Sequence, residues 1–197
     1  MRKEILEKIN KAVEEFKTVK YEKVTGNKFL SIERYKCQLN NGQVIYREKL
    51  LKNNKSGNAA IILPITKNNT TIITVQPRTF TKTTVGIALP AGYVEDNESY
   101  EEAARRELLE ETGYKAGRLI EICDYNQEEG CSSSLNKGFI AEGCEKVSDQ
   151  SLDESEYIKY FECTIDELLY LLDNGYIKGI NSQFTIEKAK EFLKKRG

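Results

Sequence analysis

The amino-acid sequence predicts an α+β fold, in which a mixed β-sheet lies between helices that pack on its faces. Three observations indicate this fold class. Strand-like runs come in pairs separated by short turns, apolar residues recur at helical spacing, and a capped helix interrupts the strands. At 197 residues the chain is long enough to bury a core, and we expect one domain with short appendages.

The first 16 residues are expected to form an amphipathic helix, because Ile5, Ile9, Ala12, Val13 and Phe16 recur at helical spacing. This helix should cover its own domain or a partner. The segment lacks the apolar block of a signal peptide, and the chain contains no run of 18 apolar residues. We therefore expect a cytoplasmic protein that does not cross a membrane.

The remaining elements follow from turn signals and helix caps. Asn40-Asn41-Gly42 between the strand-like runs 28–39 and 43–51 predicts a β-hairpin. A second pair of strands is expected around residues 67–69. Thr164, with Glu167 three residues on, predicts a capped helix. The other expected elements are strands at 58–66, 70–76, 85–89, 117–125, 137–144 and 156–163, and a final helix over 182–195.

The composition excludes several classes of function. A net charge of −1 provides no basic surface for non-specific nucleic-acid binding. The chain has no histidine, which excludes Ser-His and Cys-His catalysis and His-ligated zinc. Its five cysteines form no CxxC pair, so we expect reduced thiols rather than a thiolate metal site. Any acid–base chemistry must come from carboxylates, Tyr, Lys or water on a metal ion.

The most unusual stretch is Gly92–Tyr114, which carries eight acids against two bases, a local charge of −6. Ser99 and Glu102 have the spacing of a capping box, and Gly113 can adopt the left-handed conformation that ends a helix. The stretch therefore predicts a helix from Tyr100 to Thr112.

Three acids of this helix are expected to share one side. At about 100° per residue, Glu107, Glu110 and Glu111 fall within an arc of about 100° that also contains Ala103 and Ala104. This small, apolar side should face the protein, where unpaired carboxylates are costly. Either one acid stays protonated or a cation lies among them, and magnesium favours such oxygen ligands. We expect a metal site.

This segment resembles the Nudix box, G-x5-E-x7-R-E-U-x-E-E-x-G-U, where U is aliphatic. Eight of its nine fixed positions match, and only the last, Tyr114, departs. The resemblance implies the Nudix fold over residues 56–197 and metal-dependent hydrolysis of a nucleoside diphosphate linked to another moiety, with Mg²⁺ or Mn²⁺. The matching residues are Gly92, Glu98, Arg106, Glu107, Leu108, Glu110, Glu111 and Gly113.

The family's residue roles carry over by this resemblance. Glu107 and Glu111 are expected to be the main metal ligands, with Glu110 serving a further ion. The backbone carbonyl of Ala91 is an expected ligand as well. Arg106 should pair with Glu98, which orients the helix and keeps the guanidinium from competing for the metal.

The lead-in to the box is similar to that of the ADP-ribose pyrophosphatases, which read Q-x-R and then L-P-A-G. Gln76 and Arg78 match the first part, and residues 89–92 match the second. The resemblance therefore implies substrate binding by Gln76 and Arg78, a substrate such as ADP-ribose or an NDP-sugar, and a homodimer built by residues 1–55. Two positions depart from the subfamily pattern, namely Ala88, in place of Glu, and residues 128–130, which lack its loop proline.

A second acidic stretch, residues 152–160, matches a loop that supplies carboxylates to the metals and the attacking water in this subfamily. Glu154 and Glu156 are the candidate bases, since no histidine is available. Two other functions stay open at this point. One is a non-catalytic Nudix-fold ligand sensor, and the other is hydrolysis of another nucleotide class, such as a nucleoside triphosphate or an RNA 5′ end.

Overall fold

The computed structural model describes residues 2–17, 19–26 and 29–195. Its four helices are α1 (Arg2–Phe16), α2 (Tyr100–Thr112), α3 (Ile165–Asp173) and α4 (Ile180–Leu193). Its strands are β1 (Leu30–Gln38), β2 (Val44–Lys52), β3 (Ala59–Thr66), β4 (Thr70–Pro77), β5 (Val85–Ala88), β6 (Ala91–Tyr93), β7 (Tyr114–Lys115), β8 (Arg118–Tyr125), β9 (Asn136–Lys146) and β10 (Lys159–Thr164).

Eight strands form one mixed sheet, with the path β10-β4-β3-β9-β7. Off this path, β5 pairs with β4, β6 with β3, and β8 with β9. The central strand β3 is fully buried and runs parallel to β9, whereas its other partners are antiparallel. The predicted turn between β3 and β4 is present, but the two strands pair only at Ile65 and Thr71 before they diverge.

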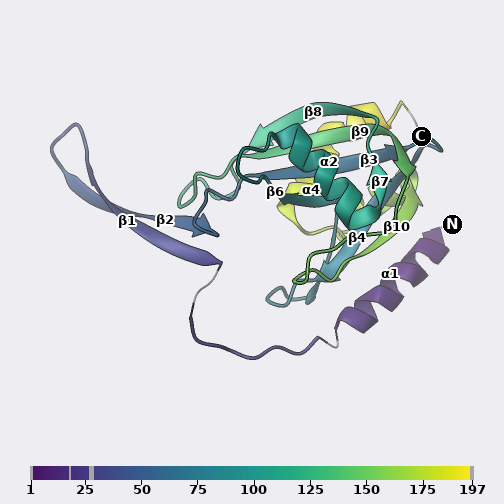
Figure 1. Ribbon diagram of the computed structural model, residues 1–197, viewed down its shortest axis with the longest axis horizontal. Coiled ribbons are helices and arrows are strands. Elements are labelled where there is room, and N and C mark those ends of the chain that lie inside the picture. Colours follow the sequence, from purple (N-terminus) through teal and green to yellow (C-terminus); the bar gives the residue numbers. More distant parts are fainter. Residues whose placement is uncertain (1, 18, 27–28, 196–197) are drawn as a thin grey trace.

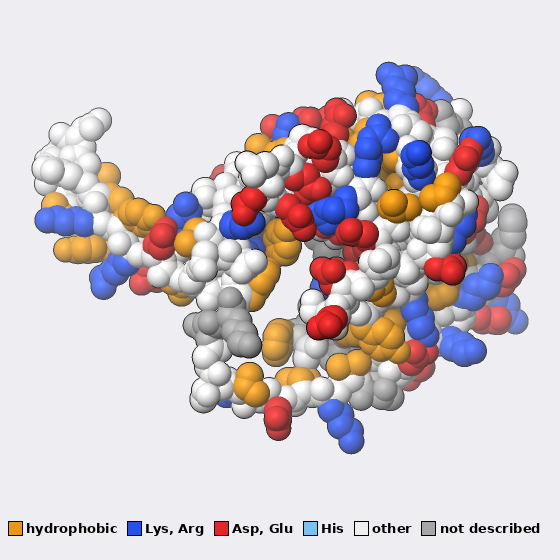
Figure 2. Space-filling view, in the orientation of Figure 1, with side chains coloured by type: hydrophobic (Ala, Val, Ile, Leu, Met, Phe, Trp, Pro, Cys, Tyr) orange, Lys and Arg blue, Asp and Glu red, His pale blue; other side chains and the backbone are white. Residues whose placement is uncertain are grey.

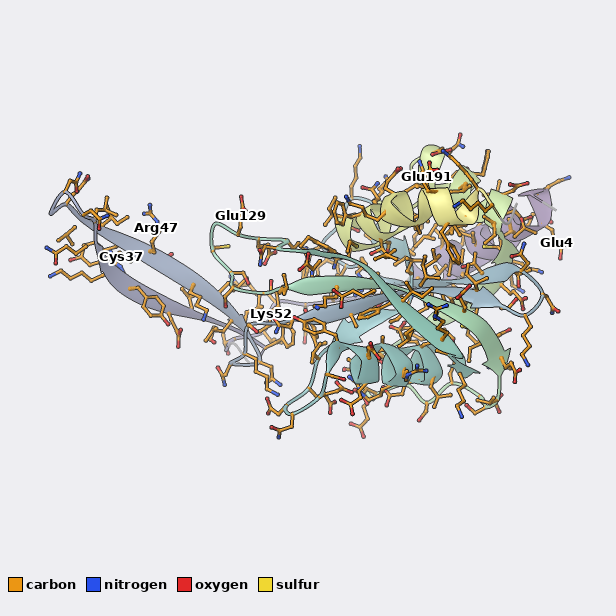
Figure 3. The ribbon with its side chains drawn as sticks, turned by 90° about the horizontal axis from the view of Figure 1, so that it is seen from above. Glu4, Cys37, Arg47, Lys52, Glu129 and Glu191 are labelled. Atoms are coloured by element: carbon orange, nitrogen blue, oxygen red, sulfur yellow. The ribbon has the colours of Figure 1, made fainter. Side chains whose placement is uncertain are left out.

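Helices cover both faces of the sheet, as expected (Figure 1). Successive side chains of β3 point to opposite faces, so the strand contributes to two cores. Ile61, Leu63 and Ile65 pack with α1, α3 and α4. Ala60 and Ile62 pack instead against α2. The view from above shows α2 below the sheet and α4 above it (Figure 3).

The predicted elements agree with the structure in type and place. Helix α2 has the expected bounds, and α4 begins two residues earlier than expected. Two short strands, β6 and β7, were missed, because a strand of two or three residues is too short to show a period. Among the described helices, none combines the length and apolar character needed to cross a membrane.

The N-terminal region is divided between two places. Helix α1 buries Ile5, Ile9, Ala12 and Phe16 in the main core. The hairpin β1–β2 instead projects from the body of the protein, with Cys37 and Arg47 far from it and Lys52 at its base (Figures 1 and 3). The hairpin contacts the rest of the protein near that base. The Leu50 N–H donates to the Cys131 carbonyl at 2.7 Å, and Lys52 lies 3.6 Å from the Glu128 carboxylate.

Candidate active site

Local signals set the position and length of helix α2. The hydroxyl of Ser99 accepts a hydrogen bond from the Glu102 N–H at 3.2 Å, and the Glu102 carboxylate accepts one from the Ser99 N–H at 2.8 Å. Gly113 ends the helix at φ 70°, the left-handed conformation that glycine adopts without a steric penalty. The predicted capping box and helix end are confirmed.

Two of the three predicted acids point inward. Glu107 is 7% exposed and Glu111 is 2% exposed, and both lie on the same side as Ala103 and Ala104. The Glu107 carboxylate packs so closely on the backbone of Gly92 that a β-carbon there would lie 1.9 Å from its Cδ. The glycine of the motif is therefore required by the close approach of strand β6 to this carboxylate. Glu110 is only partly buried, because it lies at the rim of the helix face.

Burial makes the charged form of both inward acids unfavourable. It raises the pKa of Glu107 to about 7, despite the opposing effect of Arg106. It also raises the pKa of Glu111 well above its ordinary value, and the charge of Glu107 adds to this effect. One backbone donor opposes the shift, since the N–H of Ala91 hydrogen-bonds Glu111 Oε2 at 3.1 Å. Two desolvated carboxylates thus lie at the same site and need a positive partner.

Arg106 connects the parts of this site. Its Nε and Nη2 donate to the two carboxylate oxygens of Glu98 at 2.8 and 3.0 Å, which gives the expected pair. Its Nη1 also donates to Glu107 at 2.7 Å and to Glu110 at 3.0 Å. The same guanidinium therefore contacts two of the acids that were expected to bind metal, as well as Glu98. A positive group in contact with a buried carboxylate offsets part of the cost of burying its charge.

These residues line an open cleft with a volume of about 1150 Å³. Acidic side chains gather beside the central opening of the space-filling view (Figure 2). Gln76, Arg78 and Ala91, to which the family resemblance assigned roles in the site, all line the cleft. The Arg78 side chain lies across Gly86, where a β-carbon would meet its Cγ at 2.8 Å. Burial raises the pKa of Glu111, and the charge of Arg78 acts against that rise.

The two candidate bases occupy different places. Glu156 lines the cleft, and its negative charge raises the pKa of both Glu107 and Glu111. Glu154 is exposed and does not belong to the described residues that line the cleft. A turn fixes Glu156, because its N–H donates to the Asp153 carbonyl at 2.9 Å while its carboxylate accepts from the Asp153 N–H at 3.2 Å.

The structure also brings residues to the cleft that sequence reasoning missed. Phe29 and Tyr93 form a tilted aromatic pair with ring centroids 5.8 Å apart at the cleft wall. Lys52 and Lys55 line the same wall, and Lys55 pairs with Asp96 at 2.8 Å. No local sequence signal marks Phe29, Lys52 or Lys55, because they come from the region before the acidic motif and reach the site only through the fold.

The donor set suits a hard divalent cation. Carboxylate oxygens of Glu107 and Glu111 are ligands that magnesium and manganese prefer, and a cation would relieve the cost of burying both charges. Within the part of the chain that the structure describes, no three acidic or thiol side chains are already arranged around one point as ligands. In this structure Arg106 holds Glu107 and Glu110 by hydrogen bonds.

Comparison with known proteins places this site in context. The family model described as NUDIX domain matches residues 55–183. An ADP-ribose pyrophosphatase of Bacillus subtilis (strain 168) is 29% identical over 93% of this chain and 97% of its own length. A GDP-mannose pyrophosphatase of Yersinia enterocolitica is 31% identical over 62% of this chain and 68% of its own length. A crystal structure of an ADP compounds hydrolase shares the fold, with a TM-score of 0.73 at 22% identity, covering 89% of this chain and 92% of its own.

Proposed function

The chain belongs to the NUDIX domain family, and from that premise we propose that it hydrolyses the diphosphate linkage of ADP-ribose or a related NDP-sugar with the help of Mg²⁺ or Mn²⁺. One observation carries this proposal. Two buried carboxylates, Glu107 and Glu111, lie side by side in the wall of a cleft that is large enough for a nucleotide. Carboxylates so placed are costly unless they bind a cation.

Glu107 and Glu111 are the main metal ligands in this proposal, with the Ala91 carbonyl as a further ligand and Glu110 serving a further ion. When bound, the cation neutralises the diphosphate and polarises a phosphorus for attack by water. A cation held by these residues would compete with Arg106 for Glu107 and Glu110, whereas the two bonds from Arg106 to Glu98 would not involve the ligands. Glu98 then keeps Arg106 in place beside the ligands.

The other cleft residues have two proposed roles, namely the general base and the binding of substrate. Glu156 is the better placed of the two candidate bases, because it lines the cleft and its charge acts on both proposed ligands, whereas Glu154 lies outside the lining. The guanidinium of Arg78 is suited to a substrate phosphate, and Gln76 lies beside it on β4. The exposed rings of Phe29 and Tyr93 provide a surface on which a nucleobase can stack.

The names of two relatives support this substrate class. One is called an ADP-ribose pyrophosphatase and the other a GDP-mannose pyrophosphatase, and both substrates join a nucleoside diphosphate to a sugar. Their difference in base and sugar leaves the identity of both groups to experiment.

Two further features belong to the proposal. We place the dimer interface on residues 1–55, chiefly on the hairpin, because Leu30, Ile32, Val44 and Tyr46 are exposed there. Apolar side chains on a projecting hairpin favour burial against a second copy of the chain. We also place the protein in the cytoplasm, where cysteines such as the buried Cys144 and Cys163 remain reduced.

The test is a panel of substrates with Mg²⁺ and with Mn²⁺, with the products read by mass spectrometry. The panel contains ADP-ribose, GDP-mannose, other NDP-sugars, nucleoside triphosphates and capped RNA. We expect cleavage between the two phosphates of an NDP derivative, which yields a nucleoside monophosphate and a sugar phosphate. Turnover of triphosphates or RNA ends alone would refute the substrate class, and binding without turnover would indicate a ligand sensor.

A further inference from the structure

The loop that carries Glu156 is held at its first end by the metal-binding helix. Gln150 Nε2 donates to the Glu111 carbonyl at 2.5 Å, and the Ser151 N–H donates to the Glu110 carbonyl at 2.9 Å. These bonds go to backbone groups in the last turn of α2, so the start of the loop follows the position of that helix. Asp153, Ser155, Glu156 and Tyr157 then line the cleft before the chain enters β10.

The second end of the loop is held by α1, which is distant in sequence. The Tyr157 hydroxyl donates to Glu15 Oε1 at 2.7 Å, and the Lys159 ammonium donates to Glu15 Oε2. The Tyr157 ring also meets the buried ring of Phe16 edge-on, with centroids 4.8 Å apart. Lys159 lies 5.5 Å from the centroid of the same Phe16 ring. The last turn of α1 therefore contacts the residue that directly follows Glu156.

Glu15 differs from the other acids of α1 in its partners. Among the described residues, the salt bridges of Glu4 and Glu7 go to lysines of α1, and that of Glu14 goes to Lys17, the residue that follows the helix. Those pairs are exposed and one turn apart, as on any solvated helix. Glu15 instead joins α1 to the loop and to β10 with both carboxylate oxygens. The apolar side chains of α1 already pack the helix on the core. The contacts of Glu15 are therefore not needed to hold the helix there.

We propose that Glu15 and Phe16 are positioning residues for the reaction, which hold Tyr157 and thereby set the place of the Glu156 carboxylate in the cleft. This inference rests on the proposed function, in which Glu156 acts on the attacking water. Only one peptide bond separates Glu156 from Tyr157, so a shift of the tyrosine moves the acid with it. Hydrogen bonds from the Asp153 turn fix the local shape of the segment but not its distance from Glu107 and Glu111.

The test uses two conservative variants and one matched control in the full-length protein. Tyr157→Phe removes one hydroxyl and keeps the ring on Phe16, and Glu15→Gln removes the charge that binds Lys159. Glu14→Gln is the control, because Glu14 precedes Glu15 on the same helix and its salt bridge, among the described residues, goes to Lys17 rather than to the loop. Three quantities are measured for each protein, namely amide hydrogen exchange of residues 152–157, kcat and KM for the best substrate, and the melting temperature.

We expect faster exchange of the 152–157 amides by about fivefold or more in both variants, because exchange reports local opening. We expect kcat to fall by about 10-fold with KM within twofold, since a misplacement of about 1 Å can cost on the order of 100-fold. Melting temperatures should stay close to that of the wild type, and the control should match the wild type throughout. A structural role alone would change the melting temperature without separating kcat from KM.

Each contrary result has a distinct meaning. Unchanged exchange in both variants would show that α1 does not hold the loop. Faster exchange with unchanged kcat would show that the contacts between α1 and the loop have no part in the reaction. Equal effects of Glu14→Gln and Glu15→Gln would contradict a specific role of Glu15. If the wild type hydrolyses no NDP derivative, the proposed function and the catalytic part of this inference fail together. The exchange data then still decide whether α1 holds the loop.

Discussion

Arg106 binds both carboxylate oxygens of Glu98, from Nε at 2.8 Å and from Nη2 at 3.0 Å. This pair joins the segment before α2 to the middle of the helix, and it holds the pKa of Glu98 below its usual range. The remaining guanidinium nitrogen contacts Glu107 and Glu110. A single side chain therefore links the entrance of the helix to the acids proposed to bind metal.

The first prediction concerns this pair. Arg106→Ala and Glu98→Gln should each lower the stability to urea, and the double variant should lose less than the sum of the two. Residues in direct contact show coupling energies of about 0.5–3 kcal/mol. Glu101→Gln is the control, because Glu101 lies on the exposed side of the same helix. Additive losses would show that the two side chains are not coupled.

The second prediction concerns the metal ligands. Glu111→Gln keeps the size of the side chain but removes a charged ligand, so turnover should fall by at least about 100-fold, or about 2.7 kcal/mol of barrier. The metal-free variant should be no less stable than the wild type, because it no longer buries a carboxylate. Steady-state kinetics across Mg²⁺ concentrations and thermal melts measure both effects. A variant with more than half of the wild-type turnover at saturating Mg²⁺ would exclude a metal role for Glu111.

The third prediction is a pH dependence of stability in the metal-free protein. The folded-state pKa of Glu107 is about 7, above its ordinary value of 4.5. A raised pKa means that the folded state binds the proton more tightly, so the contribution to stability is complete below about pH 4.5 and is lost as the pH rises through 7. Burial shifts the pKa of Glu111 in the same direction. The melting temperature should therefore fall between pH 5 and pH 8, by about 2–4 °C for each kcal/mol lost.

Divalent cations should reverse this loss. The increase in melting temperature on adding Mg²⁺ should be larger at pH 8 than at pH 5.5, because protons compete with the cation for the same carboxylates. Glu107→Gln should reduce the difference between the two pH values, and Glu101→Gln should leave it unchanged. An equal Mg²⁺ effect at both pH values in the wild type would contradict the prediction.

The fourth prediction separates the two candidate bases. Glu156→Gln should lower kcat by about 10²- to 10⁴-fold, the usual contribution of general acid–base catalysis. Glu154→Gln should leave kcat within about twofold, because Glu154 is exposed outside the cleft. The two variants are matched in chemistry and lie in the same loop, so each is the control for the other. A larger loss in Glu154→Gln would reverse the assignment.

The fifth prediction is that the hairpin builds a homodimer. Ile32 is 67% exposed on β1 and Tyr46 is 55% exposed on β2, although both are large apolar residues. Ile32→Glu should place a charge in the interface and shift the protein toward the monomer at micromolar concentration. Light scattering measures the mass of the wild type and the variant, with Glu33→Gln as a control on the same strand. A monomeric wild type would refute the dimer.

Local residues were sufficient to predict the elements that carry the chemistry. The capping box at Ser99 and the glycine at 113 lie within helix α2 or beside it, so its bounds follow from nearby backbone hydrogen bonds. The helical period then places Glu107 and Glu111 on one side. The Asn-Asn-Gly turn likewise predicts the hairpin β1–β2, because turn chemistry acts over a few residues.

Contacts between distant segments decided the rest. Glu107 and Glu111 are buried and Glu110 is not, because β6 packs on one side of the helix. The sequence of the helix alone does not show where that strand lies. Arg106 reaches Glu107 and Glu110 as well as Glu98, and the choice between Glu154 and Glu156 depends on how one loop turns. The docking of α1 beside that loop joins residues 142 positions apart. Helix propensity and turn chemistry act between neighbours in the chain, whereas desolvation and ion pairing act between neighbours in space, which only the folded chain defines.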